Sequence, residues 1–419
     1  MTSFAKAIAQ IKGNLEQILP DDLVDPIAGL LNLTWRDCTL TPAVTVRLAV
    51  RRCLEGGTAV SHLRHLSGLA FHRSSYGRAV QRLPETFFTL LAGVVARKLR
   101  RDRPAPLWHG HRVRLLDGSG VSMPDTPELQ AAFGQPGGQK PGCGFPVAHL
   151  LALFDHADGY LVETHLAPLR THDLAHTPTM HDAMQEGDIL LGDRAFGSFA
   201  HLALLQRRGR HGLFRLHQRR PHGLRSDRLV TYPKPKTKPS WMTAEGFAEL
   251  PETIVVREVR VTVGVPGCRV RKLVLVTTLL DREKYPAHDL AQLYGQRWQV
   301  ETNLRHLKTT LNMDVLRSQT ADGVRKEVQA FVLAYNLVRS VMATAGTQQG
   351  VPAERISFVD ALRWLRRAKA DEPVPVLLVH PARPGRFEPR AVKRRPKEYD
   401  RLTRPRKELK DRLLKNQGQ

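Results

Sequence analysis

The chain has 419 residues, a length that corresponds to roughly two or three domains of ordinary size. Hydrophobic residues make up 42% of it, so a sizeable core can be buried, and a disordered or fibrous protein is excluded. The 64 Lys and Arg residues exceed the 40 Asp and Glu residues and leave a formal net charge of +24. Such a charge repels itself in a compact protein and therefore predicts a polyanionic partner. Nucleic acid is the first candidate for this partner and an anionic membrane the second.

The four cysteines lie far apart and form no CxxC pair. This spacing argues against a disulfide framework and against a cysteine zinc module, and it fits a reducing cytosol. The first twenty residues lack the apolar segment of a signal peptide, and strongly apolar stretches such as 273–280 are too short to cross a bilayer. We therefore expect a cytoplasmic protein with no membrane partner.

Residues 1–105 are predicted to form a helical N-terminal domain, with amphipathic helices over 44–55 and 84–100. The segment 56–83 between them predicts two short helices, with a break at Ser67-Gly68 and with Ser74 or Ser75 as the N-cap of the second.

Two short helices around a glycine are the pattern of a helix-turn-helix that binds DNA. Its second helix would offer Arg73, Arg78 and Arg82 to phosphates or base edges. A plain helical bundle with solvated arginines explains the same pattern, so both interpretations stay open.

Residues 106–218 predict a mixed α/β sheet, because short apolar runs alternate with helical segments. HRVRLLDGS predicts a strand that ends at Asp117, and GDILLGD a buried strand that ends at Asp193. The remaining elements expected here are strands over 147–155, 160–169 and 211–217 and helices over 172–185 and 201–208. Ligands of open α/β sheets collect at the carboxyl ends of strands, where both aspartates are expected.

Residues 219–285 predict a β-rich insert. It begins with the Lys/Pro stretch TYPKPKTKP and continues with VVREVRVTVG and VRKLVLVTTLL, which alternate like paired strands. Residues 286–370 predict a helix that begins near Ala287 and further C-terminal helices. Residues 371–419 form a basic tail around PRAVKRRPK, which is either a solvated segment or one that grips a nucleic-acid backbone.

The helix that begins near Ala287 carries a stripe of charged and polar residues about 60° wide on a helical wheel. The stripe consists of Tyr294, Arg297, Glu301 and Lys308. Two cations and a phenol on either side of one carboxylate suit a site in which the acid holds a metal ion and the other groups bind an anionic ligand. The alternative is a salt-bridged surface, in which an i,i+4 pair between Arg297 and Glu301 would stabilise the helix by only about 0.2–0.5 kcal/mol.

Three carboxylates stand out when the acids are taken together. Asp117 alone could belong to a turn with Gly118, and Asp193 alone could cap the following helix. With Glu301 they supply the number of acids needed to hold two divalent cations about 3.5–4 Å apart. One ion would activate a water or a 3′-hydroxyl while the other stabilises the leaving oxygen.

The segment YGQRWQVETNLRHLK resembles the signature of DDE transposases of the insertion-sequence-four family: Tyr, two residues, Arg, three residues, Glu, six residues, Lys. The resemblance extends to LLDGSGVSMPDT, PGCGFP, LLGDRAFGSF and AYNLVR, and it covers roughly residues 40–365. It implies a ribonuclease-H-like catalytic core that is interrupted by a β-rich insert before the final acid.

The resemblance also implies roles for individual residues. Asp117, Asp193 and Glu301 would be the catalytic acids that hold two Mg²⁺ ions, with Mn²⁺ as a substitute. Phosphates of the transposon end would be held by Tyr294, Arg297 and Lys308, with Arg194 near the same site. Such an enzyme cuts both strands at the ends of its element and joins the 3′-hydroxyls to target DNA, without a covalent protein intermediate.

The partners implied are double-stranded DNA, in the form of terminal inverted repeats and target, and a second copy of the chain on paired ends. The location implied is the bacterial cytoplasm, with association to the nucleoid.

The sequence departs from the family pattern in the insert, where some members place a tryptophan that receives a flipped base during hairpin formation. Leu273 stands at that place and Trp241 lies in a different context, so a hairpin step is not carried over.

Two other functions remain alternatives: a ribonuclease-H-like nuclease such as a resolvase, and a transposase-derived DNA-binding protein that is no longer catalytic. A zinc site among the histidines is not supported, because His172, His176 and His181 lack an HExxH motif or a cysteine partner. We expect these histidines to be solvated or to face nucleic acid.

Overall fold

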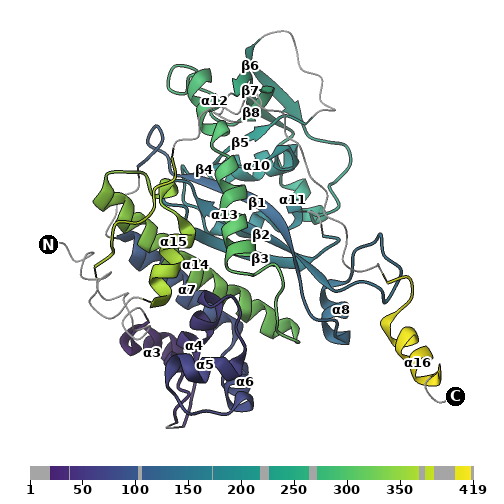
Figure 1. The fold of residues 1–419 in the computed structure, drawn as a ribbon. Helices are drawn as coiled ribbons and strands as arrows, with labels where there is room; N and C mark the ends of the chain where they lie inside the picture. Colours follow the sequence, from purple (N-terminus) through teal and green to yellow (C-terminus); the bar gives the residue numbers. More distant parts are fainter. Residues whose placement is uncertain are drawn as a thin grey trace.

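The computed structural model describes residues 19–36, 38–101, 106–171, 173–217, 226–263, 271–367, 373–381 and 402–416. The mixed α/β architecture expected from the sequence is confirmed by one eight-stranded sheet in the order β3-β2-β1-β4-β5-β8-β7-β6 (Figure 1). The strands are β1 (Val113–Ser122), β2 (Val147–Asp155), β3 (Leu161–Pro168), β4 (Ile189–Leu191), β5 (His211–Arg215), β6 (Asp227–Pro233), β7 (Thr253–Val263) and β8 (Arg271–Thr277).

Helices cover both faces of this sheet. They are α3 (Asp21–Leu30), α4 (Pro42–Leu54), α5 (Val60–Ser67), α6 (Arg73–Arg82), α7 (Glu85–Arg101), α8 (Pro127–Phe133), α9 (Thr177–Asp182), α10 (Phe199–Arg207), α11 (Ala244–Ala248), α12 (Ala287–Gly295), α13 (Trp298–Arg305), α14 (Ala321–Gln349), α15 (Phe358–Arg367) and α16 (Arg406–Asn416). Helices α12, α13 and α14 pack into the core on one face, and α9 and α10 into the core on the other. Figure 1 shows α13 crossing the sheet over β1 and β2.

Strand β1 lies between an antiparallel and a parallel neighbour. It pairs antiparallel with β2 along its whole length, to Ser122↔Val147, but parallel with β4 only as far as Leu115↔Leu191. The prediction that the strand ends at Asp117 is therefore wrong, because hydrogen bonds to β2 continue the extended backbone for five more residues. Asp117 nevertheless lies just beyond the end of the parallel pairing.

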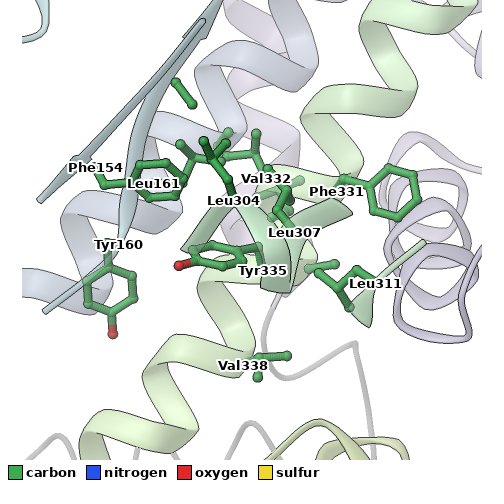
Figure 2. Close-up of a cluster of buried hydrophobic side chains, with 14 of the residues drawn as sticks. Phe154, Tyr160, Leu161, Leu304, Leu307, Leu311, Phe331, Val332, Tyr335 and Val338 are labelled. Atoms are coloured by element: carbon green, nitrogen blue, oxygen red, sulfur yellow. The ribbon is translucent and has the colours of Figure 1, made fainter. Parts of the chain in front are cut away.

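Helix α14 is the long, mostly buried helix of the main core. It is long and apolar enough to cross a membrane by length and composition, but its most apolar window is wholly buried within the protein, as in a core helix. Figure 2 shows Tyr335 and Val332 of this helix beside Leu304 and Leu307 of the segment that follows Glu301. The helix therefore anchors the segment that carries the final acid.

The N-terminal helices fall into two groups. Helices α3, α4 and α7 share the main core with α14, whereas α5 and α6 pack with part of α4 around a small core of their own. The break between α5 and α6 falls at Gly68, whose φ of 68° is the left-handed conformation that glycine adopts most easily. The expected serine N-cap of α6 is wrong: His72 caps this helix, because its ring nitrogen accepts a hydrogen bond from Ser74 N.

The β-rich insert extends the central sheet. Its strand β8 pairs antiparallel with β5, and β7 and β6 follow outward. Leu273 of β8 is buried in the main core, and Trp241 is half-buried against the other core. Most of the basic tail lies outside the described residues, but α16 is described, and the Arg406 guanidinium lies 5.1 Å from the ring of Phe145 in the PGCGFP segment.

Candidate active site

Asp117 and Asp193 project from the same face of neighbouring strands. In the parallel register Leu115 lies beside Leu191, and both belong to the core beneath α13 and α14, whereas Leu116 and Leu190 belong to the opposite core. Because strand side chains alternate between faces, a residue two positions further along returns to the same face. Asp117 continues β1 in this way, and Asp193 follows β4, where it caps the short helix η2 (Arg194–Phe196) by accepting a hydrogen bond from Ala195 N at 2.7 Å.

Arg297 links the first aspartate to the glutamate on the facing helix. Its guanidinium lies 3.0 Å from Glu301 Oε1 and 3.9 Å from Asp117 Oδ2. The i,i+4 ion pair of the alternative interpretation is thus formed, but the same arginine also reaches the strand. Glu301 therefore faces β1 rather than belonging to an isolated surface pair.

The pKa of Asp117 records the closeness of the three acids. This pKa is raised to about 6, and burial is the largest cause. A hydrogen bond from Gly118 N and the positive charge of Arg297 lower it, and the carboxylates of Asp193 and Glu301 raise it by smaller contributions. The Asp117 side chain remains 24% exposed and that of Glu301 43%, so the group is open to solvent.

The acids fit a hard divalent cation by their chemistry. Carboxylate oxygens are the ligands that Mg²⁺ and Mn²⁺ prefer, and a cation would offset the negative charge that Asp193 and Glu301 place near Asp117. Within the described part of the chain, however, no three His, Cys, Asp or Glu side chains are grouped closely enough to hold a metal ion. Instead, Arg297 supplies the positive charge beside two of the acids.

The polar stripe does not lie on one regular helix as expected. Helix α12 ends at Gly295, the next turn is tightened by a hydrogen bond from Arg297 N to Tyr294 O, and a π-helical turn follows α13 at His306–Thr310. The angles of a regular helical wheel are therefore wrong in detail, because a tight turn and a wide turn change the angle per residue. Lys308, in the wide turn, still faces β1 and donates a hydrogen bond to Ser119 Oγ at 2.8 Å.

The other residues expected at the site differ in exposure. Tyr294 is buried, which raises its pKa, while the charge of Arg297 lowers it and that of Asp193 raises it. The tyrosine thus lies within electrostatic reach of both Arg297 and Asp193. Arg194 is exposed next to Asp193.

Sequence reasoning missed Ser119, although its place two residues after Asp117 on an alternating strand puts it on the same face. It was also wrong about His181, which is fully buried and stacked on His201, with their Nε2 atoms 2.8 Å apart. His176 stacks on His165 with ring centroids 4.1 Å apart, and His172 lies outside the described residues. A sequence shows no signal for such pairs, because the partners come from different elements.

Comparison with known proteins identifies the family of the chain. The family described as "Transposase DDE domain" matches residues 108–337, more than half of the chain and a span that contains all three acids. The chain is 24% identical over 322 residues to the transposase InsG for insertion sequence element IS4 of Escherichia coli (strain K12), with 71% of each protein covered. A solved structure of piggyBac transposase in a synaptic complex with hairpin DNA covers 84% of this chain and 78% of its own, at 8% identity and a TM-score of 0.45. The chain therefore belongs to the DDE transposases, enzymes that cut and join DNA, and within them to the insertion-sequence-four family.

Proposed function

We propose that this transposase excises an insertion sequence by cutting its ends and joins the 3′-hydroxyl ends to target DNA by two-metal phosphoryl transfer. The observations that carry the proposal are that one guanidinium, Arg297, lies beside both Asp117 and Glu301, and that Asp193 follows the strand paired with the one that carries Asp117. A ribonuclease-H-like catalytic core is part of the proposal. It is supported by the mixed sheet in which antiparallel β3, β2 and β1 continue into parallel β4 and β5.

Asp117, Asp193 and Glu301 would hold two Mg²⁺ ions, with Mn²⁺ as a substitute. When bound, these ions supply activation of the attacking oxygen and neutralisation of the leaving one. The protein itself positions the DNA. Arg297 and Lys308 face β1 from the helical side, so both cations can contact phosphates next to the acids, with Tyr294 and Arg194 at the margin of the site.

Arg297 has a second task in this proposal. In the DNA-free protein it neutralises Glu301 and approaches Asp117. A phosphate of the transposon end offers the guanidinium a stronger bidentate partner, which would release the two carboxylates. Binding of DNA and loading of metal would thus support each other at the same arginine.

Terminal inverted repeats and target DNA are the proposed partners. Supporting this, a hollow of about 730 Å³ lies beside helix α6 and is lined also by residues of the segment between α5 and α6 and by Arg36, Cys38, Thr39 and Leu40. Arg36, Arg78 and Arg82 line it, and none of the described residues around it is acidic. This arrangement suits a phosphate backbone and supports a DNA-binding N-terminal region over 1–105, ahead of the catalytic core.

The rest of the proposed organisation follows the predicted boundaries: a catalytic core over 106–218 and 286–370, an insert over 219–285 and a basic tail over 371–419. We further propose that two copies act together on paired ends, and that the enzyme works in the bacterial cytoplasm at the nucleoid. The exposed arginines of α6 and the net charge of +24 support a protein held close to DNA.

A strand-transfer assay tests the function. Purified protein is incubated with Mg²⁺, a pre-cut oligonucleotide carrying the inverted repeat that flanks its gene, and a supercoiled target plasmid. Joining of the 3′-hydroxyl end to the plasmid supports transposition. A ribonuclease-H-like nuclease would cut uncut ends without joining pre-cut ones, and a non-catalytic DNA-binding protein would retard the oligonucleotide in a gel without changing it.

A further inference from the structure

The turn that carries Asp193 is held at its far end by a buried histidine. Asp193 begins η2, and Phe196 ends it. His201, fully buried on helix α10, donates a hydrogen bond from Nδ1 to Phe196 O at 2.7 Å. The N-cap of the same helix, Ser198, accepts from His201 N, so both the backbone and the side chain of His201 are fixed.

A second buried histidine fixes the orientation of this ring. His181 of α9 stacks on His201 with ring centroids 5.0 Å apart and an interplanar angle of 9°, and the two Nε2 atoms lie 2.8 Å apart. Because Nδ1 of His201 carries the proton that Phe196 O accepts, its Nε2 is the acceptor in the neutral ring. His181 Nε2–H must then donate to it, which orders the chain His181, His201, Phe196 O.

Burial keeps both rings neutral, as this chain of donors requires. It lowers the pKa of His201 to about 4 and that of His181 to about 2. Nδ1 of His181 has no hydrogen-bond partner in the described part of the chain, as expected for the acceptor nitrogen at the end of such a chain. At neutral pH, His181 thus donates to His201, and His201 donates to Phe196 O in the turn.

The turn gains from this external support because its two backbone–backbone hydrogen bonds are long, although the Asp193 side chain also caps it by accepting from Ala195 N at 2.7 Å. Phe196 N to Asp193 O and Gly197 N to Arg194 O both measure 3.4 Å, at the far end of the usual range. Close packing completes the support: a Cβ on Gly192 would come within 2.8 Å of the Phe196 ring. His201 and the Phe196 ring therefore hold the turn on which the Asp193 carboxylate is placed.

We propose that His201, oriented by His181, is a positioning residue that holds the Asp193 turn in the conformation needed to bind the divalent cation. The inference rests on the proposed metal-binding role of Asp193. Neither histidine touches substrate or metal; both act through the backbone carbonyl of Phe196. In other metal sites, removal of outer groups that fix a ligand costs about 10–100-fold in metal affinity.

The test measures Mn²⁺ binding to the DNA-free full chain by electron paramagnetic resonance, together with the Mg²⁺ dependence of strand transfer. His201→Leu removes the donor to Phe196 O and should weaken Mn²⁺ affinity about tenfold or more. His201→Asn places an amide N–H near the position of Nδ1 and should recover most of that loss. His181→Leu, which leaves the His201 ring free to change its tautomer, should give a smaller loss.

A matched control separates positioning from stability. Leu205 is fully buried on the same helix and in the same core, but its apolar side chain forms no hydrogen bond, so Leu205→Ala destabilises the fold and leaves the hydrogen bond from His201 to Phe196 O in place. It should lower the melting temperature while Mn²⁺ affinity stays unchanged. In transfer assays His201→Leu should raise the Mg²⁺ concentration for half-maximal rate, with the rate at saturation less affected.

The outcomes distinguish the inference from the proposed function. Loss of Mn²⁺ binding in Asp193→Asn together with unchanged binding in His201→Leu would overturn the positioning role alone. An equal loss in Leu205→Ala and His201→Leu, or no recovery in His201→Asn, would also reject it. If Asp193→Asn binds Mn²⁺ as well as the original protein, the metal site itself, and the function built on it, is wrong.

Discussion

The guanidinium of Arg297 lies 3.9 Å from the carboxylate of Asp117, although one residue is at the start of a helix and the other in the middle of a strand. The same guanidinium is paired with Glu301. Two acids that are far apart in the sequence thus share one cation. This relationship joins the strand side of the site to its helical side.

Replacing Glu301 by Gln should abolish cleavage and strand transfer while binding of terminal DNA persists. In the proposed function the change removes one of the three charges that hold the metal ions and leaves a side chain of the same size. Several kcal/mol of transition-state stabilisation should then be lost, or about 10³-fold or more in rate. Single-turnover cleavage and gel retardation on the same DNA measure the two effects. Cleavage by this variant at near-original rate would remove Glu301 from the site.

Replacing Asp117 by Asn should stabilise the DNA-free, metal-free protein above pH 6. In the folded protein the pKa of Asp117 is raised from 3.8 to about 6, so the folded state holds this proton more tightly than the unfolded state. The original protein therefore loses stability as pH rises from about 4 to about 6, and Asn avoids that loss. The gain should be on the order of 2 kcal/mol above pH 6 and absent below about pH 4.

Urea unfolding of both proteins across this pH range measures that gain. Glu283→Gln removes an exposed carboxylate outside the site and serves as the control, with no gain in stability expected. A constant difference between the Asn variant and the original protein at all pH values would contradict a raised pKa at Asp117.

Affinity for Mn²⁺ should fall as the pH drops below about 6. In the proposed function the metal binds the carboxylate form of Asp117, so protons would compete with it below the raised pKa of this group. For one displaced proton the decline approaches about tenfold per pH unit. Calorimetric titration at several pH values, with circular dichroism to show that the fold is retained, tests this. Affinity that is independent of pH between about 5 and about 7 would refute it.

Replacing Lys308 by Ala should weaken the binding of DNA at the cleavage site. It should also reduce the slope of the salt dependence of binding by about the contribution of one neutralised phosphate. Lys308 reaches Ser119 on the strand that carries Asp117, so its ammonium lies where a phosphate next to the acids would be. Lys308→Arg retains the charge and should retain the slope. Fluorescence anisotropy at several salt concentrations gives the slope for each protein. Identical slopes for Lys308→Ala and the original protein would exclude binding of a phosphate by Lys308.

The double replacement Arg78→Ala and Arg82→Ala should lower affinity for the terminal repeat and flatten its salt dependence, by about one neutralised phosphate for each arginine that grips the backbone. Arg64→Ala is the control, since Arg64 is exposed on α5 but does not line the hollow. Binding curves for the repeat and for unrelated DNA separate specific from general binding. Equal effects of the control and the double variant would show that the hollow has no special role.

Much of the fold could be predicted because its elements are locally encoded. The short apolar runs VAHLLALFD and GDILLGD identified β2 and β4, and Asp193 lies two residues beyond β4, close to the strand end at which it was expected. The end of β1 was not predictable, since pairing with β2 rather than local sequence decides how far it extends. The spacing of Tyr294, Arg297, Glu301 and Lys308 was visible, but not the tight and wide turns that reshape the segment.

Interactions between distant segments were invisible in the sequence. The reach of Arg297 to Asp117 and the stacking of His181 on His201 depend on how sheet and helices pack, and no local pattern encodes that. The sequence pointed to the arginines of the second short helix as possible contacts to DNA, but not to the hollow that Arg78 and Arg82 line together with Arg36. The hollow beside α6 became apparent only from the folded chain.

The insert cannot be deleted without affecting the rest of the sheet. Because β8 hydrogen-bonds directly to β5, excision of the 219–285 segment would strip one edge of the remaining sheet and leave its backbone groups free to pair with other molecules. Minimal versions of this enzyme should therefore be made by trimming loops or termini. A chain shortened at the insert is expected to aggregate during expression, whatever the state of its three acids.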